Sequence, residues 1–182
     1  PYKPTIQVDD DPMSIGRFHP VTIGLLGEAA VTAETLGAAL DAAAGTWHDR
    51  RGEVAERWAI WRDEKARRTA DDAAHGIGAA AVMDSLTRLV DPDAVIAVDV
   101  GNNTYSFGRY FEASGRQDLV MSGYLGSIGF ALPAAMGAWA AFGDSRQIVS
   151  VSGDGGFGQY AMELTTAVKY GMDITDVVLD NG

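Results

Sequence analysis

The sequence contains no cysteine in its 182 residues, which excludes disulfide bonds, thiolate metal sites and cysteine nucleophiles. Positive charge is also scarce, since 14 Lys and Arg stand against 25 Asp and Glu and give a formal net charge of −11. A chain this acidic is repelled by nucleic acid and by anionic membrane surfaces, so we expect neither as a partner. The absence of cysteine makes a cytoplasmic protein the expected case, and the first residues do not resemble a signal peptide.

Long uncharged runs are rare as well, and the one exception covers residues 119–142. This run is long enough to suggest a membrane span, but four glycines and Pro133 interrupt it. We therefore expect a strand, a loop and a buried helix there, and no transmembrane segment.

A phosphate cradle is predicted where the apolar run 147–152 opens into Gly153, Asp154, Gly155 and Gly156. Glycines let the backbone approach an anion, and the start of a following helix offers unpaired N–H groups. A carboxylate at Asp154 would repel a bare diphosphate, so it fits this place only if a divalent cation lies between them. The simpler alternative is that Asp154 caps the helix that follows.

A second oxygen ligand is predicted at Asn181, which lies 27 residues after Asp154. That separation leaves room for one helix and one strand. In a parallel sheet the carboxyl ends of neighbouring strands face the same crevice, so both side chains could reach one ion. Mg²⁺ prefers such oxygen ligands and shares its octahedron with phosphate and water.

The pattern from residue 76 onward predicts an α/β fold with a parallel sheet and helices on both faces, because apolar runs alternate with helical segments. The expected strands are 94–98, 119–121, 147–152 and 174–179, and the expected helices include 79–89, 132–142 and 157–170.

The earlier part of the chain predicts a different organisation. Residues 1–45 hold two short strands, near 5–8 and 21–26, and an alanine-rich helix over 29–44, too little to bury its own faces. We interpret them as the C-terminal part of a Rossmann-like central domain. Residues 46–75 are expected to form a connecting helical linker, because Val54, Trp58 and Trp61 recur at helical spacing. Acidic residues interleave with the basic ones of this segment and disfavour the alternative of a nucleic-acid arm. Residues 76–182 then begin the cofactor-binding domain.

Three segments together resemble the thiamine diphosphate enzymes of the pyruvate oxidase, quinone-linked pyruvate dehydrogenase and acetolactate synthase group. Gly153-Asp154-Gly155 with Asn181 is similar to their cofactor signature. Residues 99–104 resemble the first diphosphate loop, and residues 122–133 resemble the segment that binds the aminopyrimidine. The sequence departs from the family at Asp180, where many members have a first Asn.

The resemblance implies thiamine diphosphate and Mg²⁺ as cofactors, with Asp154 and Asn181 as the metal ligands. It also implies that the Gly126 carbonyl accepts from the 4′-amino group and that the Ile128 side chain wedges between the two rings. By the same resemblance Asp9 could meet FAD. The implied cofactor-binding set is Val100, Gly101, Asn102, Asn103, Gly126, Ile128, Gly153, Asp154, Gly155, Gly156 and Asn181.

The activity implied by the resemblance is decarboxylation of a 2-oxo acid, with pyruvate as the expected substrate, followed by oxidation or carboligation. The family's active site lies between subunits of a homodimer or homotetramer, and its activating glutamate comes from a separate domain. No segment here resembles that domain, so we expect no catalytic residue in this chain and no turnover from these 182 residues alone.

A second class of function stays open, because Gly153, Gly155 and Gly158 also satisfy the G-x-G-x-x-G spacing after a strand. That spacing is typical of an NAD(P)- or FAD-binding Rossmann-type oxidoreductase. Asp154 argues against this alternative, because such a site binds the pyrophosphate without a metal and a carboxylate there would weaken binding.

Overall fold

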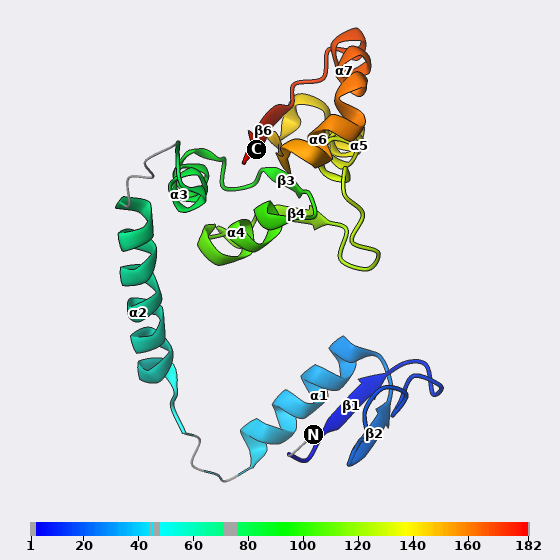
Figure 1. Ribbon diagram of the computed structural model, residues 1–182. Helices are drawn as coiled ribbons and strands as arrows, with labels where there is room; N and C mark the ends of the chain where they lie inside the picture. The colour runs from blue at the N-terminus through cyan, green and yellow to red at the C-terminus, as the bar shows by residue number, and fades with distance from the viewer. Residues whose placement is uncertain (1–2, 44, 46–47, 71–75, 182) are drawn as a thin grey trace. The chain divides into compact units, whose positions relative to one another are not determined.

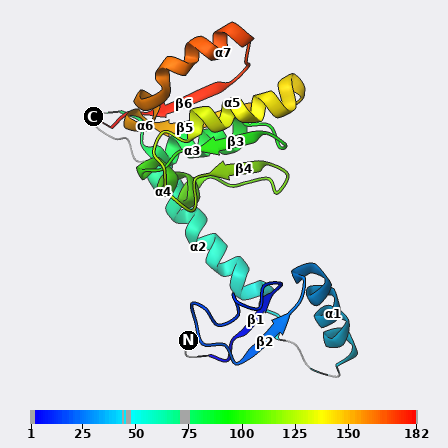
Figure 2. The same cartoon turned by 90° about the vertical axis from the view of Figure 1, so that its right-hand side faces the viewer.

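The computed structural model describes residues 3–43, 45, 48–70 and 76–181. The chain divides into two compact units, residues 1–52 and residues 53–182. Figures 1 and 2 show the elements of both units in two perpendicular views.

The first unit is a parallel strand pair with one helix (Figure 1). Strand β1 (Ile6–Asp9) pairs with β2 (Ile23–Leu26), and α1 (Ala29–Ala42) follows at once. The Glu28 side chain caps α1 by accepting from the Val31 N–H at 2.8 Å, which satisfies one of the free donors at the helix start. None of the described residues of this unit is buried, although the expected elements are present within a few residues of their predicted bounds.

The second unit contains a four-stranded sheet in the order β4-β3-β5-β6. Its strands are β3 (Val95–Val98), β4 (Asp118–Met121), β5 (Ile148–Gly153) and β6 (Thr175–Leu179), and every neighbouring pair is parallel. The fold class predicted from the sequence is therefore confirmed.

Helices cover both faces of this sheet (Figure 2). On one face, Met83 and Phe107 pack with Ile96, Val98 and other strand residues. On the other face, Ala131 and Ala135 pack against their strand neighbours, which explains why both faces of β3 and β5 are apolar. The helical elements of this unit are α2 (Arg51–Ala70), α3 (Ala79–Leu89), α4 (Asn102–Tyr110), α5 (Ala131–Phe142), η1 (Gly143–Ser145), α6 (Asp154–Tyr160), η2 (Ala161–Glu163) and α7 (Leu164–Tyr170).

The segment after β5 differs from the expected single helix over 157–170. Helix α6 already begins at Asp154, and the 3₁₀ turn η2 separates it from α7. Helix α7 ends at Tyr170, and its C-cap Gly171 has the left-handed conformation that glycine adopts without strain. The cradle residues 154–156 are consequently the first turn of a helix rather than a loop before one.

The order of the strands reverses between β3 and β5. The chain leaves β3 through α4 toward β4 on one side, and it leaves β5 through α6 and α7 toward β6 on the other. In open parallel sheets a crevice forms at the carboxyl ends of the strands where the order reverses, and ligands bind there. The two glycine-containing segments, 101–103 and 153–156, follow the two strands at this point.

The predicted connecting segment contains one long helix, α2. Its Lys65 side chain is buried and pairs with Asp84 of α3 at 3.2 Å and with Glu112 at 2.9 Å, which attaches α2 to the rest of the unit. Residues 71–75 of the predicted linker lie outside the described residues. No helix within the described ranges is long and apolar enough to cross a membrane.

Candidate functional site

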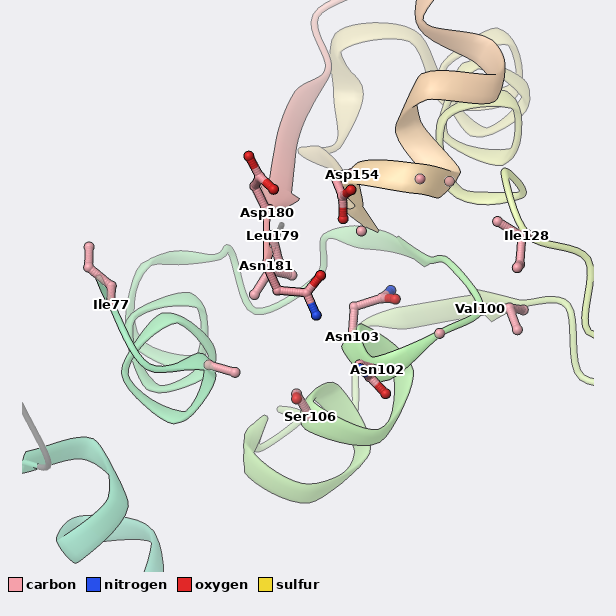
Figure 3. Close-up of a pocket in the computed structure, with 15 residues that line it drawn as sticks. Ile77, Val100, Asn102, Asn103, Ser106, Ile128, Asp154, Leu179, Asp180 and Asn181 are labelled. Atoms are coloured by element: carbon pink, nitrogen blue, oxygen red, sulfur yellow. The ribbon is translucent and has the colours of Figure 1, made fainter. Parts of the chain in front are cut away.

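A pocket of about 330 Å³ opens at the carboxyl ends of β3, β5 and β6 (Figure 3). Its lining residues come from five segments of the sequence. They are Ile77, Ala79, Val100, Gly101, Asn102, Asn103, Ser106, Ile128, Gly153, Asp154, Gly155, Gly156, Leu179, Asp180 and Asn181.

The wall after β3 is held in shape by side chains of α4. Asn103 is buried, and its amide group donates to the backbone carbonyls of Asp99 at 2.9 Å and Val151 at 3.3 Å. The Thr104 hydroxyl accepts from the Gly101 N–H and donates to the Asp99 carbonyl. Gly101 has φ 149°, and a Cβ there would lie 2.9 Å from the Asn103 side-chain oxygen, so this turn requires glycine.

The wall after β5 begins with a tight strand-to-helix turn. Gly153 is the N-cap of α6, so Asp154 is the first residue of the helix and not its cap. The Asp154 side chain is exposed to the pocket, and a Cβ at Gly155 would meet nothing within 4 Å, so open space faces this turn. Gly156, in contrast, is buried.

The third wall is the end of β6, where Asp180 and Asn181 follow the strand. Figure 3 shows the Asn181 amide turned toward Asn103 and the space beside Asp154, whereas the Asp180 carboxylate points the other way. The parallel pairing of β5 with β6, with Gly153 opposite Leu179, brings Asp154 and Asn181 to the same edge of the sheet.

The fourth wall comes from the segment before α5. Gly126 has φ 63°, and its N–H donates to the Ser122 carbonyl at 3.1 Å, while the Ser122 hydroxyl accepts from the Ser127 N–H. The Ile128 side chain is 50% exposed and lines the pocket, so it is not an ordinary core aliphatic.

The structure brings ten of the residues predicted to bind the cofactor into one pocket. Gly126 does not line it, but it lies beside Val100, because a Cβ at Gly126 would be 3.9 Å from a Val100 methyl. Asp9 belongs to the other compact unit, where its carboxylate accepts from the Asp11 N–H. Sequence analysis missed Ser106, although it lies one helical turn after Asn102 and so shares a face of α4 with it.

The remaining lining residues that sequence analysis did not single out are Ile77, Ala79 and Leu179, together with Asp180, which was noted only as a departure from the family. They supply apolar contact and one further charge. Nothing in their types distinguishes them from ordinary helix and strand residues, so only the fold identifies them.

The donor set of the pocket fits a diphosphate bound through Mg²⁺. Asp154 and Asn181 offer one carboxylate and one amide oxygen, which are the hard ligands that Mg²⁺ prefers. Among the described residues, no three His, Cys, Asp or Glu side chains are grouped to hold a metal ion. Two protein side chains completed by phosphate oxygens and water are a usual arrangement for Mg²⁺, and the glycine turns leave room for the phosphates.

Comparison with known proteins agrees with this geometry. Residues 99–182 match the family described as "Thiamine pyrophosphate enzyme, C-terminal TPP binding domain", thiamine pyrophosphate being another name for thiamine diphosphate. The match begins at Asp99 and includes every wall of the pocket except Ile77 and Ala79. This match identifies residues 99–182 as a domain of the thiamine pyrophosphate enzyme family.

Several curated relatives match nearly the whole chain. The Bacillus subtilis protein YdaP, named as thiamine pyrophosphate-containing, is 34% identical over 98% of the chain and 30% of its own length. The large subunit of acetolactate synthase isozyme 3 of Escherichia coli is 30% identical over 100% of the chain and 31% of its own length. Pyruvate oxidase of Lactiplantibacillus plantarum is 26% identical over 97% of the chain and 28% of its own length. The chain thus spans about three tenths of the length of these relatives.

Proposed function

We propose that the protein to which this chain belongs decarboxylates a 2-oxo acid, with pyruvate as substrate, using thiamine diphosphate and Mg²⁺. The observation that carries the proposal is the meeting of Asp154, Asn181 and the glycine turns of two strands at one pocket. The names of the relatives, acetolactate synthase and pyruvate oxidase, support a 2-oxo acid as the substrate class.

The proposed roles of the residues follow from their positions. Asp154 and Asn181 hold Mg²⁺, and Mg²⁺ in turn neutralises the diphosphate beside the Asp154 carboxylate. The backbone at Gly101, Gly153 and Gly155 approaches the phosphates, with Asn102 and Asn103 closing the same wall. When bound, thiamine diphosphate supplies a nucleophilic carbon and a sink for the electrons left by departing CO₂.

The segment before α5 is proposed to orient the rest of the cofactor. The Gly126 carbonyl would accept a hydrogen bond from the amino group of the pyrimidine, and the half-exposed Ile128 side chain would contact the cofactor beside it. By holding the cofactor in one orientation, these residues would give it the rate advantage of reacting groups that are fixed close together.

Calorimetric titration of the full-length protein with thiamine diphosphate tests the cofactor proposal. We expect saturable binding with Mg²⁺ present and its loss after EDTA, and we expect pyruvate-dependent CO₂ release from the loaded protein. Absence of thiamine diphosphate binding would overturn the proposal. NAD binding that survives EDTA would favour a Rossmann-type oxidoreductase instead.

Two finer parts of the proposal need their own measurements. Product analysis separates oxidation from carboligation after decarboxylation, and flavin absorbance in the purified protein tests FAD, for which Asp9 is the proposed contact. Light scattering tests the proposed homodimer or homotetramer with an active site between subunits.

A further inference from the structure

Asp99 directly follows strand β3 and is only 1% exposed, yet its side chain is a carboxylate. One carboxylate oxygen accepts from three backbone N–H groups, those of Val100 at 2.7 Å, Gly129 at 2.9 Å and Phe130 at 3.1 Å, and the other oxygen accepts from Gly129 at 3.1 Å. With these hydrogen bonds, the buried polar group is well satisfied.

These bonds join two segments that are 30 residues apart in the sequence. Val100 begins the wall after β3, whereas Gly129 and Phe130 directly follow Ile128 in the wall before α5. The Asp99 backbone carbonyl also accepts from Asn103 and Thr104, which fixes the first turn of α4. Asp99 therefore fixes the position of the wall before α5 relative to the wall after β3.

The wall after β5 also contacts the Asp99 carboxylate. A Cβ at Gly156 would overlap that carboxylate far inside van der Waals contact, so the first turn of α6 can pack against Asp99 only with glycine at this position. On its other side Gly129 faces Tyr160 of α6, because a Cβ at Gly129 would lie 2.6 Å from the Tyr160 ring. The Gly129 backbone is thus held between β3 and α6.

We propose that Asp99 is a positioning residue that holds the Gly126–Ile128 segment at a fixed offset from the diphosphate wall, so that both ends of thiamine diphosphate are bound at once. The proposal rests on the proposed function, since it assumes that this segment contacts the pyrimidine. A ligand that uses both walls needs them at one separation, whereas a ligand that uses only the diphosphate wall does not.

The ratio of the affinities for a two-wall ligand and a one-wall ligand therefore separates a positioning role from a merely structural one. In the full-length protein with Mg²⁺, thiamine diphosphate and inorganic diphosphate share the phosphate contacts, but only the former reaches the segment before α5. Loss of positioning should weaken thiamine diphosphate selectively, whereas general damage to the pocket should weaken both ligands alike.

The first variant is Asp99→Asn, which keeps the side-chain shape and one acceptor oxygen but turns an NH₂ group toward the Gly129 N–H. We expect the dissociation constant of thiamine diphosphate to rise by about tenfold or more, and that of inorganic diphosphate by less than about threefold. The matched control is Asp84→Asn, a half-buried carboxylate on α3 that does not line the pocket, and both constants should stay near wild type.

The second variant moves the same segment without altering Asp99. Gly129→Ala adds a Cβ against Tyr160 at a residue with φ 86°, where a side chain is strained. We expect the same selective loss, with Gly137→Ala on α5 as the control because a Cβ there meets nothing within 4 Å.

The proposal is overturned if neither variant is selective, whether both ligands weaken equally or neither changes. Thermal melts show which variants fold, and the selectivity is read from those that do; if neither folds, the positioning role is rejected in favour of a purely structural one. The wild-type titration is read separately, because its failure with thiamine diphosphate rejects the proposed function and not the positioning role.

Discussion

Two neighbouring parallel strands, β3 and β5, each lead into an aspartate at the carboxyl edge of the sheet, and the two aspartates have opposite surroundings. Asp99 is buried and accepts from three backbone N–H groups. Asp154 is exposed and faces the pocket. The residue type and its place after a strand are the same, so the difference arises from which segments return to cover each strand end.

The contrast separates a carboxylate used by the protein from one left available to a ligand. The segment before α5 folds back over the end of β3 and brings its own N–H donors, which satisfies Asp99. At the end of β5 the chain turns directly into α6, and Asp154 stays in front of open space. Burial should therefore decide which substitution changes stability and which changes binding.

The largest effect on stability is expected for Asp99→Ala. This change leaves the buried Gly129 N–H and the partly buried N–H groups of Val100 and Phe130 without their acceptor, and an unsatisfied buried group costs about 1–3 kcal/mol. We expect the free energy of unfolding of the full-length protein to fall by at least about 3 kcal/mol, measured by chemical denaturation. Asp154→Ala is the matched comparison. Equal losses of unfolding free energy in the two variants would contradict the stated difference between the buried and the exposed aspartate.

The next effect separates two adjacent glycines of α6. In Gly156→Ala the new methyl group overlaps the Asp99 carboxylate, and overpacking of this kind costs about 1–3 kcal/mol. In Gly155→Ala the methyl group meets nothing within 4 Å, so stability should be unchanged or slightly raised. Denaturation midpoints of the two variants test this, and a Gly155→Ala loss as large as that of Gly156→Ala would show that the turn, not Asp99, requires glycine.

The sequence predicted the sheet well because each strand is a short apolar run bounded by turn residues. The four strands after residue 93 appear within two residues of their expected bounds, and the glycine and asparagine segments meet at one edge as parallel strands require. These features depend on local pattern and on the general behaviour of parallel sheets, so they can be read without knowing the packing.

Features that depend on distant contacts were not predicted. The break between α6 and α7 falls next to Tyr160, whose ring packs against Gly129, and nothing in the local pattern indicates that contact. The role of Asp99 depends on N–H groups 30 residues later in the chain. The division into residues 1–45, 46–75 and 76–182 stays a prediction, as do the roles assigned to the individual cofactor ligands.

An intermediate case is Glu112, which is partly exposed and has a cationic partner. The Lys65 ammonium beside it, helped by Arg62, holds the pKa of Glu112 below its ordinary value of 4.5, although partial burial opposes the shift. A lowered pKa in the folded state means that the carboxylate stabilises the fold above the unfolded-state pKa, and that this contribution disappears as the pH falls through the folded-state pKa.

Glu112→Gln should therefore cost about 1 kcal/mol at pH 7, since Lys65 keeps Asp84 as a partner. The difference from wild type should shrink as the pH falls below 4.5, because protonated wild type then lacks the same charge. Denaturation curves measured at several pH values test this. A difference that stays constant down to pH 3 would contradict the assigned cause.

The smallest change in stability is expected for Asp154→Asn, together with a large change in binding. The side chain is exposed, so the free energy of unfolding should stay within about 0.5 kcal/mol of wild type. Removing the charged ligand should weaken Mg²⁺-dependent binding of thiamine diphosphate about a hundredfold, and EDTA should then have little further effect. Asp180→Asn is the control, because its carboxylate points away from the Asn181 amide, and its effect on binding should be much smaller. Equal losses in the two variants would mean that the pocket responds to its total charge rather than to a bound cation at Asp154.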